Sequence, residues 1–213
     1  MTSMDKLLSI GSEPLAPRPK VLPKVLEAYK IGPELFHMLE CKNGFYAFES
    51  ALHVFPLSSA NEMSLEEWNA DSLWRDGYRD LAEGLLFFAE DAFQDQFCLS
   101  GHGVLRFCAE TGAAAFMADS IESWAAEILA DYKCQTAWTL ANKWQAENGP
   151  LATNKRLMPK IPFFLGGEYS IENLWVGDPV EGMRYKADLA LQTRELPDGS
   201  IVKLNIAGKP RPQ

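Results

Sequence analysis

Three carboxylates, Glu90, Asp91 and Asp95, stand between two apolar segments of the sequence. Two carboxylates in different environments can serve as general acid and general base when they face each other across a cleft. Here the acids end the segment LLFFAE and begin the segment DQFCLS, so the turn of a β-hairpin separates them. Acidic side chains at such a turn usually finish two strands in water. We therefore expect an outward-facing surface that docks another molecule and does not break bonds.

The alternative is a hydrolase that uses the acids of residues 90–95 with His102, with or without a metal ion. Cys98 and His102 are four residues apart, but zinc sites usually combine two close ligand pairs, and no second pair follows. The sequence also lacks the G-x-S-x-G, P-loop and dinucleotide-binding patterns. We predict a protein that is not an enzyme and that uses no metal and no cofactor.

Charge is unevenly distributed along the 213 residues, whose formal net charge is −9. Residues 31–135 contain five Lys and Arg but eighteen Asp and Glu, which gives this segment a net charge of −13. Phosphate contacts need cations, so we do not expect nucleic-acid binding there. An acidic surface speeds the approach of a basic protein, although acidic residues also serve solubility alone.

A second group of acids lies in residues 64–78, SLEEWNADSLWRDGY. Ser64 and Glu67 have the spacing of a capping box, which predicts a short helix that starts here. We expect Trp74 to be an apolar anchor beside these acids, because tryptophan is enriched among interface hot spots. The predicted partner-binding residues are Glu66, Glu67, Asp71, Trp74, Glu90, Asp91 and Asp95.

Proline, capping and periodicity signals divide the first 150 residues into elements. Four prolines in residues 11–24 predict an extended arm. Short helices are then expected through Tyr29 and over 33–42, followed by a β segment over 44–57 and strands over 85–90, 95–100, 104–109 and 114–118. A long amphipathic helix should follow, with Asp119 and Glu122 as its capping box, a kink near Cys134 and an end at Asn148-Gly149-Pro150.

The last third of the sequence reads as strand, helix, strand. Apolar runs predict strands in IPFFLGG, ENLWVGD and IVKLNI, and a helix over 180–196. The fold class is therefore α+β, with a mostly antiparallel, meander-type sheet flanked by helices. We expect a Pro-rich arm over 1–20, a core over 21–150 and an extension over 151–213 that packs on the same domain.

The sequence predicts a cytoplasmic protein. It contains no apolar stretch of about eighteen residues and no basic-then-apolar leader, so we expect no membrane association and no signal peptide. Because cysteines stay reduced in that compartment, we expect four free, buried thiols, at Cys41, Cys98, Cys108 and Cys134. A self-associating structural protein, such as a homodimer, is a further alternative to a module that binds a different protein.

Several segments, taken in order, resemble the SUKH superfamily, which includes the SMI/KNR-like regulators of cell-wall assembly. They are NGFYAFESALHVFPL, then a tryptophan-containing segment, then LLFFAEDAFQDQFCL, VLRFCAETG and FMADSIESWAAEIL. The resemblance covers residues 32–135, and the tail that starts PFFLGGEYSIENLWVGD is similar to the extension of one bacterial subgroup. One departure is Gln94, where relatives usually have glycine. The turn therefore either does not need a positive φ angle or is strained.

The resemblance implies function as well as fold. Many bacterial members of this superfamily resemble immunity proteins, which bind and neutralise a secreted toxin that is often a nuclease. Eukaryotic relatives are regulatory interaction modules, and neither group is known as an enzyme class. The resemblance thus implies a non-catalytic protein-binding module, with an immunity protein against a basic toxin as the candidate function.

Overall fold

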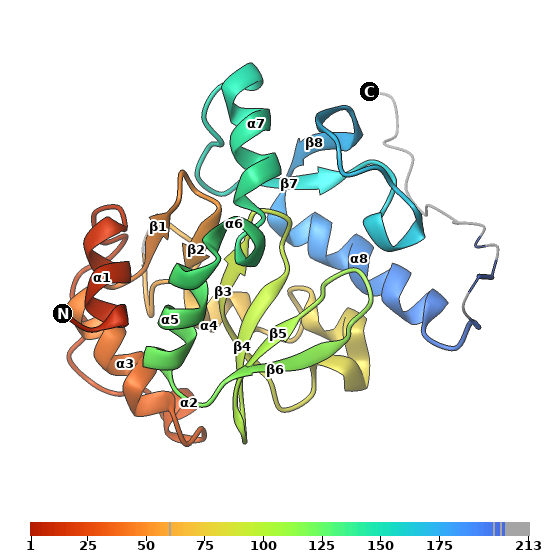
Figure 1. Ribbon diagram of the computed structural model, residues 1–213. Helices are drawn as coiled ribbons and strands as arrows, with labels where there is room; N and C mark the ends of the chain where they lie inside the picture. Colours follow the sequence, from red (N-terminus) through yellow and green to blue (C-terminus); the bar gives the residue numbers. More distant parts are fainter. Residues whose placement is uncertain (60, 198, 201, 203–213) are drawn as a thin grey trace.

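A six-stranded antiparallel sheet forms the centre of the computed structural model, which describes residues 1–59, 61–197, 199–200 and 202. Each strand from β1 to β6 lies beside the next strand of the sequence (Figure 1). Helices flank this sheet, and two further strands, β7 and β8, form a separate antiparallel pair. The predicted α+β class with a meander-type antiparallel sheet is confirmed.

The bounds of the elements follow the chain in order. The strands are β1 Phe45–Ala47, β2 Leu52–Val54, β3 Leu86–Asp91, β4 Gln96–Ser100, β5 Gly103–Phe107, β6 Ala114–Ala118, β7 Arg156–Pro159 and β8 Leu174–Gly177. The α-helices are α1 Ser3–Ile10, α2 Lys24–Glu27, α3 Gly32–Cys41, α4 Leu65–Trp68, α5 Ile121–Ala130, α6 Tyr132–Gln135, α7 Trp138–Asn148 and α8 Pro179–Thr193. The 3-10 helices are η1 Arg75–Ala82, η2 Phe163–Leu165 and η3 Ile171–Asn173.

The two central strands are covered on both faces. All residues of β3 and β4 are buried, which explains why their sequences are apolar runs without alternation. The pairing of Glu90 with Gln96 places the β3–β4 turn at one end of these strands, and the pairing of Ser100 with Gly103 places the β4–β5 turn at the other. Side chains near the β3–β4 turn therefore lie under the helices and loops that pack on that end.

The proline-rich arm runs along the outer edge of β1. The backbone N–H groups of Ser12, Leu15 and Ala16 donate to carbonyl oxygens of residues 46, 44 and 43 at 2.7, 3.0 and 3.1 Å. Residues 12–23 form no helix, as expected, and the arm covers backbone groups that an edge strand otherwise leaves open. The arm is not extended from residue 1, however, because α1 precedes it with a capping box between Thr2 and Asp5.

The predicted cap of the helix after the sheet is wrong by one residue. Ser120 is the N-cap of α5, and its Oγ accepts from the N–H of Ser123. Glu122 does not form a capping box with Asp119. Its carboxylate instead accepts from the backbone N–H groups of Ser3 and Met4, at 2.6 and 3.0 Å, and so holds the start of α1 against α5.

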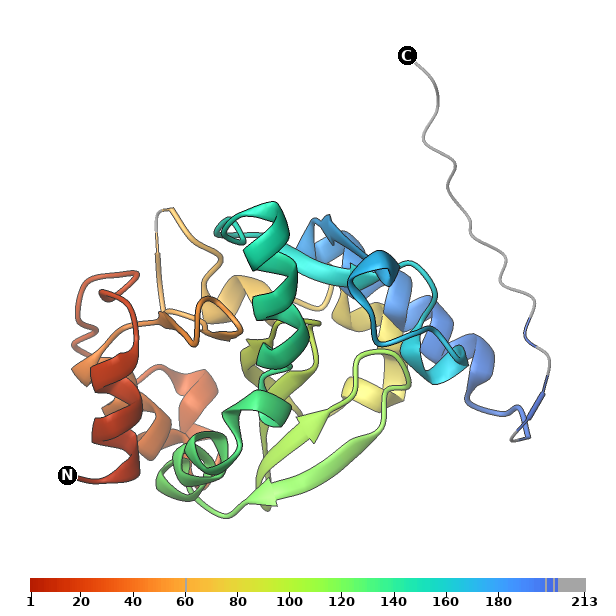
Figure 2. The ribbon, with the colours of Figure 1, turned by 45° about the horizontal axis from the view of Figure 1, so that its top comes forward.

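The helical region that follows the sheet consists of three segments. Asp131 ends α5 and caps α6, and Ala137, with a φ of 56°, precedes α7. The kink expected near Cys134 is therefore two breaks, and the predicted stop at Gly149 is confirmed. Figures 1 and 2 show α1 and α3 at one end of the molecule and β7, β8 and α8 at the other.

Part of the predicted extension differs from the structure. The segment IPFFLGG contains the 3-10 helix η2 and no strand, and the strand β7 lies before it, with Pro159 opposite Leu174 of β8. The helix predicted over 180–196 is confirmed as α8. The strand predicted in IVKLNI lies, apart from Val202, outside the described residues.

Tryptophans form the middle of the hydrophobic core. Trp68, Trp74 and Trp124 are buried, and the ring of Trp74 lies 5.4 Å from that of Trp68 and 4.9 Å from that of Phe87 between centroids. The expectation that Trp74 is an exposed anchor is therefore wrong. A tryptophan ring buries a large apolar area, so Trp74 stabilises the fold by packing in the core.

The cysteines are free but only partly buried. Cys98 is buried and Cys108 half-buried, whereas Cys41 and Cys134 are exposed, so the prediction of four buried thiols is wrong for those two. No helix in the described part of the chain is long and apolar enough to cross a membrane.

Candidate functional site

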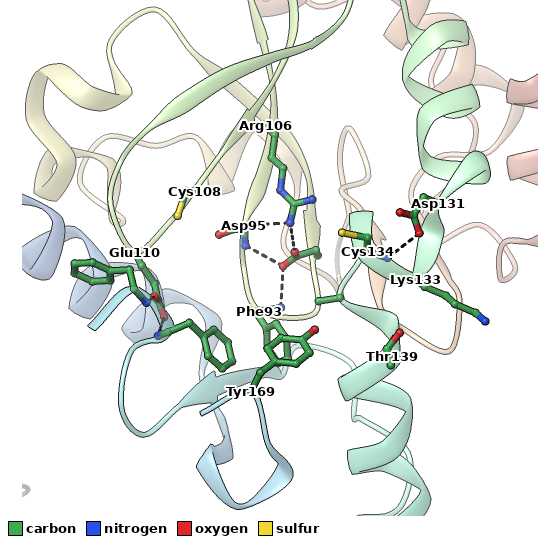
Figure 3. Close-up of a pocket in the computed structure, with 14 residues that line it drawn as sticks. Phe93, Asp95, Arg106, Cys108, Glu110, Asp131, Lys133, Cys134, Thr139 and Tyr169 are labelled. Atoms are coloured by element: carbon green, nitrogen blue, oxygen red, sulfur yellow. Dashed lines mark hydrogen bonds and ion pairs between the residues drawn. The ribbon is translucent and has the colours of Figure 1, made fainter. Parts of the chain in front are cut away.

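A pocket of about 630 Å³ lies where the end of the β3–β4 hairpin meets α6 and the connection between β7 and β8 (Figure 3). Ligand pockets commonly measure about 300–1,000 Å³. Exposed side chains at its rim, such as Lys133 and Tyr169, leave it open to solvent. Its lining consists of Asp91, Phe93, Asp95, Arg106, Cys108, Glu110, Asp131, Lys133, Cys134, Ala137, Thr139, Phe163, Phe164 and Tyr169.

Arg106 hydrogen-bonds several residues that line this pocket or lie next to it (Figure 3). Its Nη2 donates to Asp91 Oδ2 at 3.0 Å and to Asp95 Oδ2 at 3.3 Å. Its Nη1 donates to the backbone and side-chain oxygens of Gln135 at 3.1 and 3.0 Å. The guanidinium thus joins β5 to the hairpin turn and to α6, and two carboxylates already balance its charge.

Asp91 is buried beneath the pocket and does not face water, which corrects the expectation from the sequence. Its Oδ1 accepts from the backbone N–H groups of Phe93 and Asp95 at 2.8 and 3.0 Å, so it also shapes the turn. Burial and the neighbouring Asp95 raise the pKa of Asp91 to about 7, against the opposing effect of Arg106.

Asp95 and Glu110 fix the neighbouring backbone. Asp95 is partly exposed, and its Oδ1 accepts from the N–H of Ala109 at 3.0 Å. Glu110 accepts from the N–H groups of Phe163 and Phe164 at 3.3 and 3.1 Å, which anchors η2 to the sheet. Burial raises the pKa of Glu110, and these two backbone donors oppose that shift. The carboxylates are therefore held in place and keep further lone pairs for another donor.

Four aromatic rings line the pocket beside the carboxylates. The ring centroid of Phe93 lies 5.2 Å from that of Phe163 and 5.9 Å from that of Tyr169, both in edge-to-face arrangements. Tyr169 is 58% exposed and Phe164 39% exposed, so two aromatic rings of the lining face solvent. A wall of exposed rings beside carboxylates favours a ligand that carries an alkyl or planar cation.

Glu90 points away from the pocket into a separate buried network, so the expectation that it faces outward is also wrong. Its Oε1 lies 2.7 Å from Arg156 Nε and 3.3 Å from His53 Nδ1, and its Oε2 accepts from Gln96 Nε2 at 3.3 Å. Burial opposes the charge, but Arg156 and His53 lower the pKa of Glu90. Burial also lowers the pKa of His53 to about 4. The carboxylate is therefore paired inside the core.

Gln94 occupies the turn with a φ of 71°, so the turn does need the left-handed conformation that glycine adopts easily. Its buried side chain explains why glutamine is tolerated there. Nε2 donates to the backbone oxygen of Pro179 at 2.6 Å, and Oε1 accepts from Lys186 Nζ at 3.4 Å. Lys186 also donates to the backbone oxygen of Phe93. Gln94 thus joins the hairpin turn to the first turns of α8.

The remaining predicted acids lie elsewhere on the molecule. Glu66 and Glu67 are exposed on α4, where Glu67 accepts from the N–H and the hydroxyl of Ser64 and confirms the capping box. Asp71 is exposed and pairs with Arg75 at 3.3 Å. None of these three lines the pocket. The seven predicted residues therefore separate into the pocket, the buried network, the core and the α4 surface.

The alternative site of acids with His102 does not assemble. His102 lies in the β4–β5 turn, at the end of β4 opposite to Asp91 and Asp95. Five residues of extended strand separate the two ends by about 17 Å. Within the described residues, no group of three or more His, Cys, Asp or Glu side chains is placed to hold a metal ion.

Sequence reasoning missed the residues that complete the pocket. Arg106 follows the apolar segment VL and looks like an ordinary strand residue, and Glu110 looks like part of a turn. The sequence predicts a strand for Phe163 and Phe164, and no predicted element contains Tyr169. A charged residue inside an otherwise apolar strand was the one available signal, because such a residue must find a partner when its strand is buried.

Comparison with known proteins identifies a similar fold only. No protein-family model and no curated protein sequence matches the chain. Among solved structures, the crystal structure of Atu4351 from Agrobacterium tumefaciens is similar, with a TM-score of 0.55 and 13% sequence identity. The match covers 85% of this chain and 86% of Atu4351. At this identity the likeness supports the fold alone.

Proposed function

We propose that this chain is a cytoplasmic, non-catalytic protein-binding module of the SUKH type, and that its partner is a basic protein. An immunity protein that neutralises a basic toxin, such as a nuclease, is the specific role that we favour. The docking site in this proposal is the pocket at the end of the β3–β4 hairpin, where the partly exposed Asp95 and the exposed Asp131 can meet a partner. Glu90 and Trp74 are buried outside this pocket and cannot contact a partner.

The observation that carries the proposal is how the charged groups of the pocket are already paired and held in place. Four carboxylates and two cations line it, and Arg106 is already occupied by Asp91 and Asp95. Asp95 and Glu110 are held by backbone donors, so their positions do not depend on a ligand. A preorganised set of acceptors beside exposed rings suits a Lys or Arg side chain of a partner, since little ordering is needed on binding.

The charge of the surrounding surface supports the same class of partner. The net −13 of residues 31–135 includes exposed acids on α4 and in η1, and such a field attracts a basic protein from a distance. Attraction of this kind raises the association rate more than the final affinity. In this proposal the exposed acids attract the partner from a distance, and the pocket then binds it.

The test is association with a panel of basic secreted nuclease domains, measured by biolayer interferometry at about 50 and 300 mM NaCl. Asp131→Asn removes a charge at the pocket rim and leaves an oxygen to cap α6. Tyr169→Ser removes the exposed ring. We expect each variant to weaken binding by about tenfold or more, as at interface hot spots. The matched controls are Asp188→Asn and Trp175→Ser, both exposed and outside the pocket.

Three outcomes would oppose the proposal. If charge reversal of Glu66, Glu67 and Asp71 abolishes binding while the pocket variants bind normally, the α4 surface is the docking site. If no basic domain of the panel binds even at low salt, the proposed class of partner is wrong. If a basic protein such as lysozyme binds as well as the panel domains do, the attraction is only nonspecific charge.

A further inference from the structure

A small hollow of about 10 Å³ lies beside the buried network around Glu90. It is lined by residues of β1, β2 and α4, by the end of β3, and by residues 154–156 and Pro179. The hollow is therefore formed where the first hairpin of the sheet meets the C-terminal extension. It is separate from the pocket described above.

Three buried polar atoms of residues that line this hollow have no hydrogen-bond partner among the described residues. They are Tyr46 Oη, His53 Nε2 and Arg156 Nη2. The ring centroid of Tyr46 lies 4.3 Å from that of His53 and 5.5 Å from the Arg156 guanidinium carbon. A buried polar atom without a partner costs about 1–3 kcal/mol, so three such atoms on one hollow point to a common partner.

We propose that this hollow is a binding site for one structural water molecule, which hydrogen-bonds Tyr46 Oη, His53 Nε2 and Arg156 Nη2. The volume is near the smallest that holds a water, and a buried water usually makes about three hydrogen bonds. A water bound there joins β1 and β2 to β7.

The donors and acceptors match a water and not an ion. His53 Nδ1 faces the Glu90 carboxylate and is the protonated nitrogen, so Nε2 is an acceptor. Arg156 Nη2 and the Tyr46 hydroxyl donate. A water accepts these two hydrogen bonds and donates a third to His53 Nε2. An anion would leave His53 Nε2 without a donor and would lie against Glu90, and a cation would lie against Arg156.

The first test is a crystal structure of the full chain at about 1.5 Å resolution, from crystals grown in chloride and from crystals soaked in bromide. We expect density for one water within about 3.2 Å of Tyr46 Oη, His53 Nε2 and Arg156 Nη2, and no anomalous peak there after the soak. A bromide peak in the hollow overturns the proposal. So does an empty hollow, or a set of side chains that satisfy one another directly.

A second measurement in solution does not depend on crystals. We expect a nuclear Overhauser effect between water and the imidazole Hε1 of His53 that persists in the folded protein. Tyr46→Phe removes one donor and should shorten the residence of the water, whereas Tyr185→Phe, at a half-buried ring outside the hollow, should not. Absence of the effect in the wild-type protein overturns the proposal, as does an equal effect in both variants and the wild type.

Discussion

Glu90 Oε1 and Arg156 Nε lie 2.7 Å apart, and both side chains are buried. This pair joins the end of β3, in the main sheet, to β7, in the smaller sheet. Taking two charges out of water is costly, and the attraction repays the cost only when further hydrogen bonds complete the site. His53 and Gln96 supply those bonds to the carboxylate. The extension is therefore attached to the core through a polar contact that depends on each of its members.

Glu90→Gln should destabilise the fold strongly. The substitution leaves Arg156 buried without a countercharge, a change that typically costs about 3–5 kcal/mol. Denaturant unfolding measures the loss. The matched control is Glu181→Gln, which removes one partner of the exposed 2.9 Å pair with Arg184 and should cost less than about 1 kcal/mol. Addition of Arg156→Met to Glu90→Gln should recover part of the loss. Equal costs for the two single variants would contradict the role given to the buried pair.

Stability should fall on acidification because of His53. Its pKa is about 4 in the folded chain against 6.5 unfolded, because burial disfavours the imidazolium ion. The unfolded chain binds the proton first, so stability is complete above pH 6.5 and decreases as the pH falls towards 4, by about 3 kcal/mol in total. Unfolding curves at several pH values for the wild type and for His53→Gln give the difference. His102→Gln, at an exposed imidazole in the β4–β5 turn, serves as the control.

The contribution of Asp91 to stability should depend on pH in the opposite direction to that of His53. Burial and Asp95 raise its pKa to about 7, above the unfolded value of 3.8. Its contribution to stability is therefore complete below pH 3.8 and is lost as the pH rises from 3.8 through about 7. Asp91→Asn keeps an oxygen for the N–H groups of Phe93 and Asp95 and should remove this decrease of stability between about pH 4 and 7. Asp76→Asn, at an exposed carboxylate, serves as the control. A slope that persists in Asp91→Asn would assign it to another group.

Gln94 permits a test that separates backbone strain from side-chain contacts. Gln94→Gly relieves the positive φ and loses the bonds to Pro179 and Lys186, whereas Gln94→Ala loses the same bonds and keeps the strain. We expect Ala to be less stable than Gly by about 1 kcal/mol in thermal or denaturant unfolding. If both variants equal the wild type, the contacts of Gln94 do not hold α8 to the turn.

Local sequence signals predicted the sheet well. Four apolar segments separated by short turns predicted β3 to β6 in order, and the Ser64–Glu67 box predicted the start of α4. These features depend on residues a few positions apart. Glu122 shows the limit, because its spacing from Asp119 suggested a cap while its carboxylate binds the N-terminus of α1, more than a hundred residues away in the sequence.

The sequence predicted only part of the candidate site, because the site also depends on contacts between residues far apart in the chain. Sequence reasoning placed Glu90, Asp91 and Asp95 at a hairpin end, which is correct, but put all three in water. The burial of Glu90 and Asp91 follows from elements that come much later in the chain, since Arg156 lies on β7 and Lys186 on α8. Trp74 is a similar case: its aromatic neighbours Trp68 and Phe87 come from α4 and β3, and no spacing rule pairs them.

The two edges of the main sheet are protected differently. The arm holds residues 12–16 against β1, whereas β6 has no neighbouring strand on its outer side within the described chain, and its exposed residues Ala114, Ala115 and Phe116 carry no charge. A chain with one bare edge can pair once and then stops growing, as a closed dimer. Removal of the first sixteen residues would bare the second edge as well, and each molecule could then add neighbours at both sides, which is the geometry of an unlimited fibre.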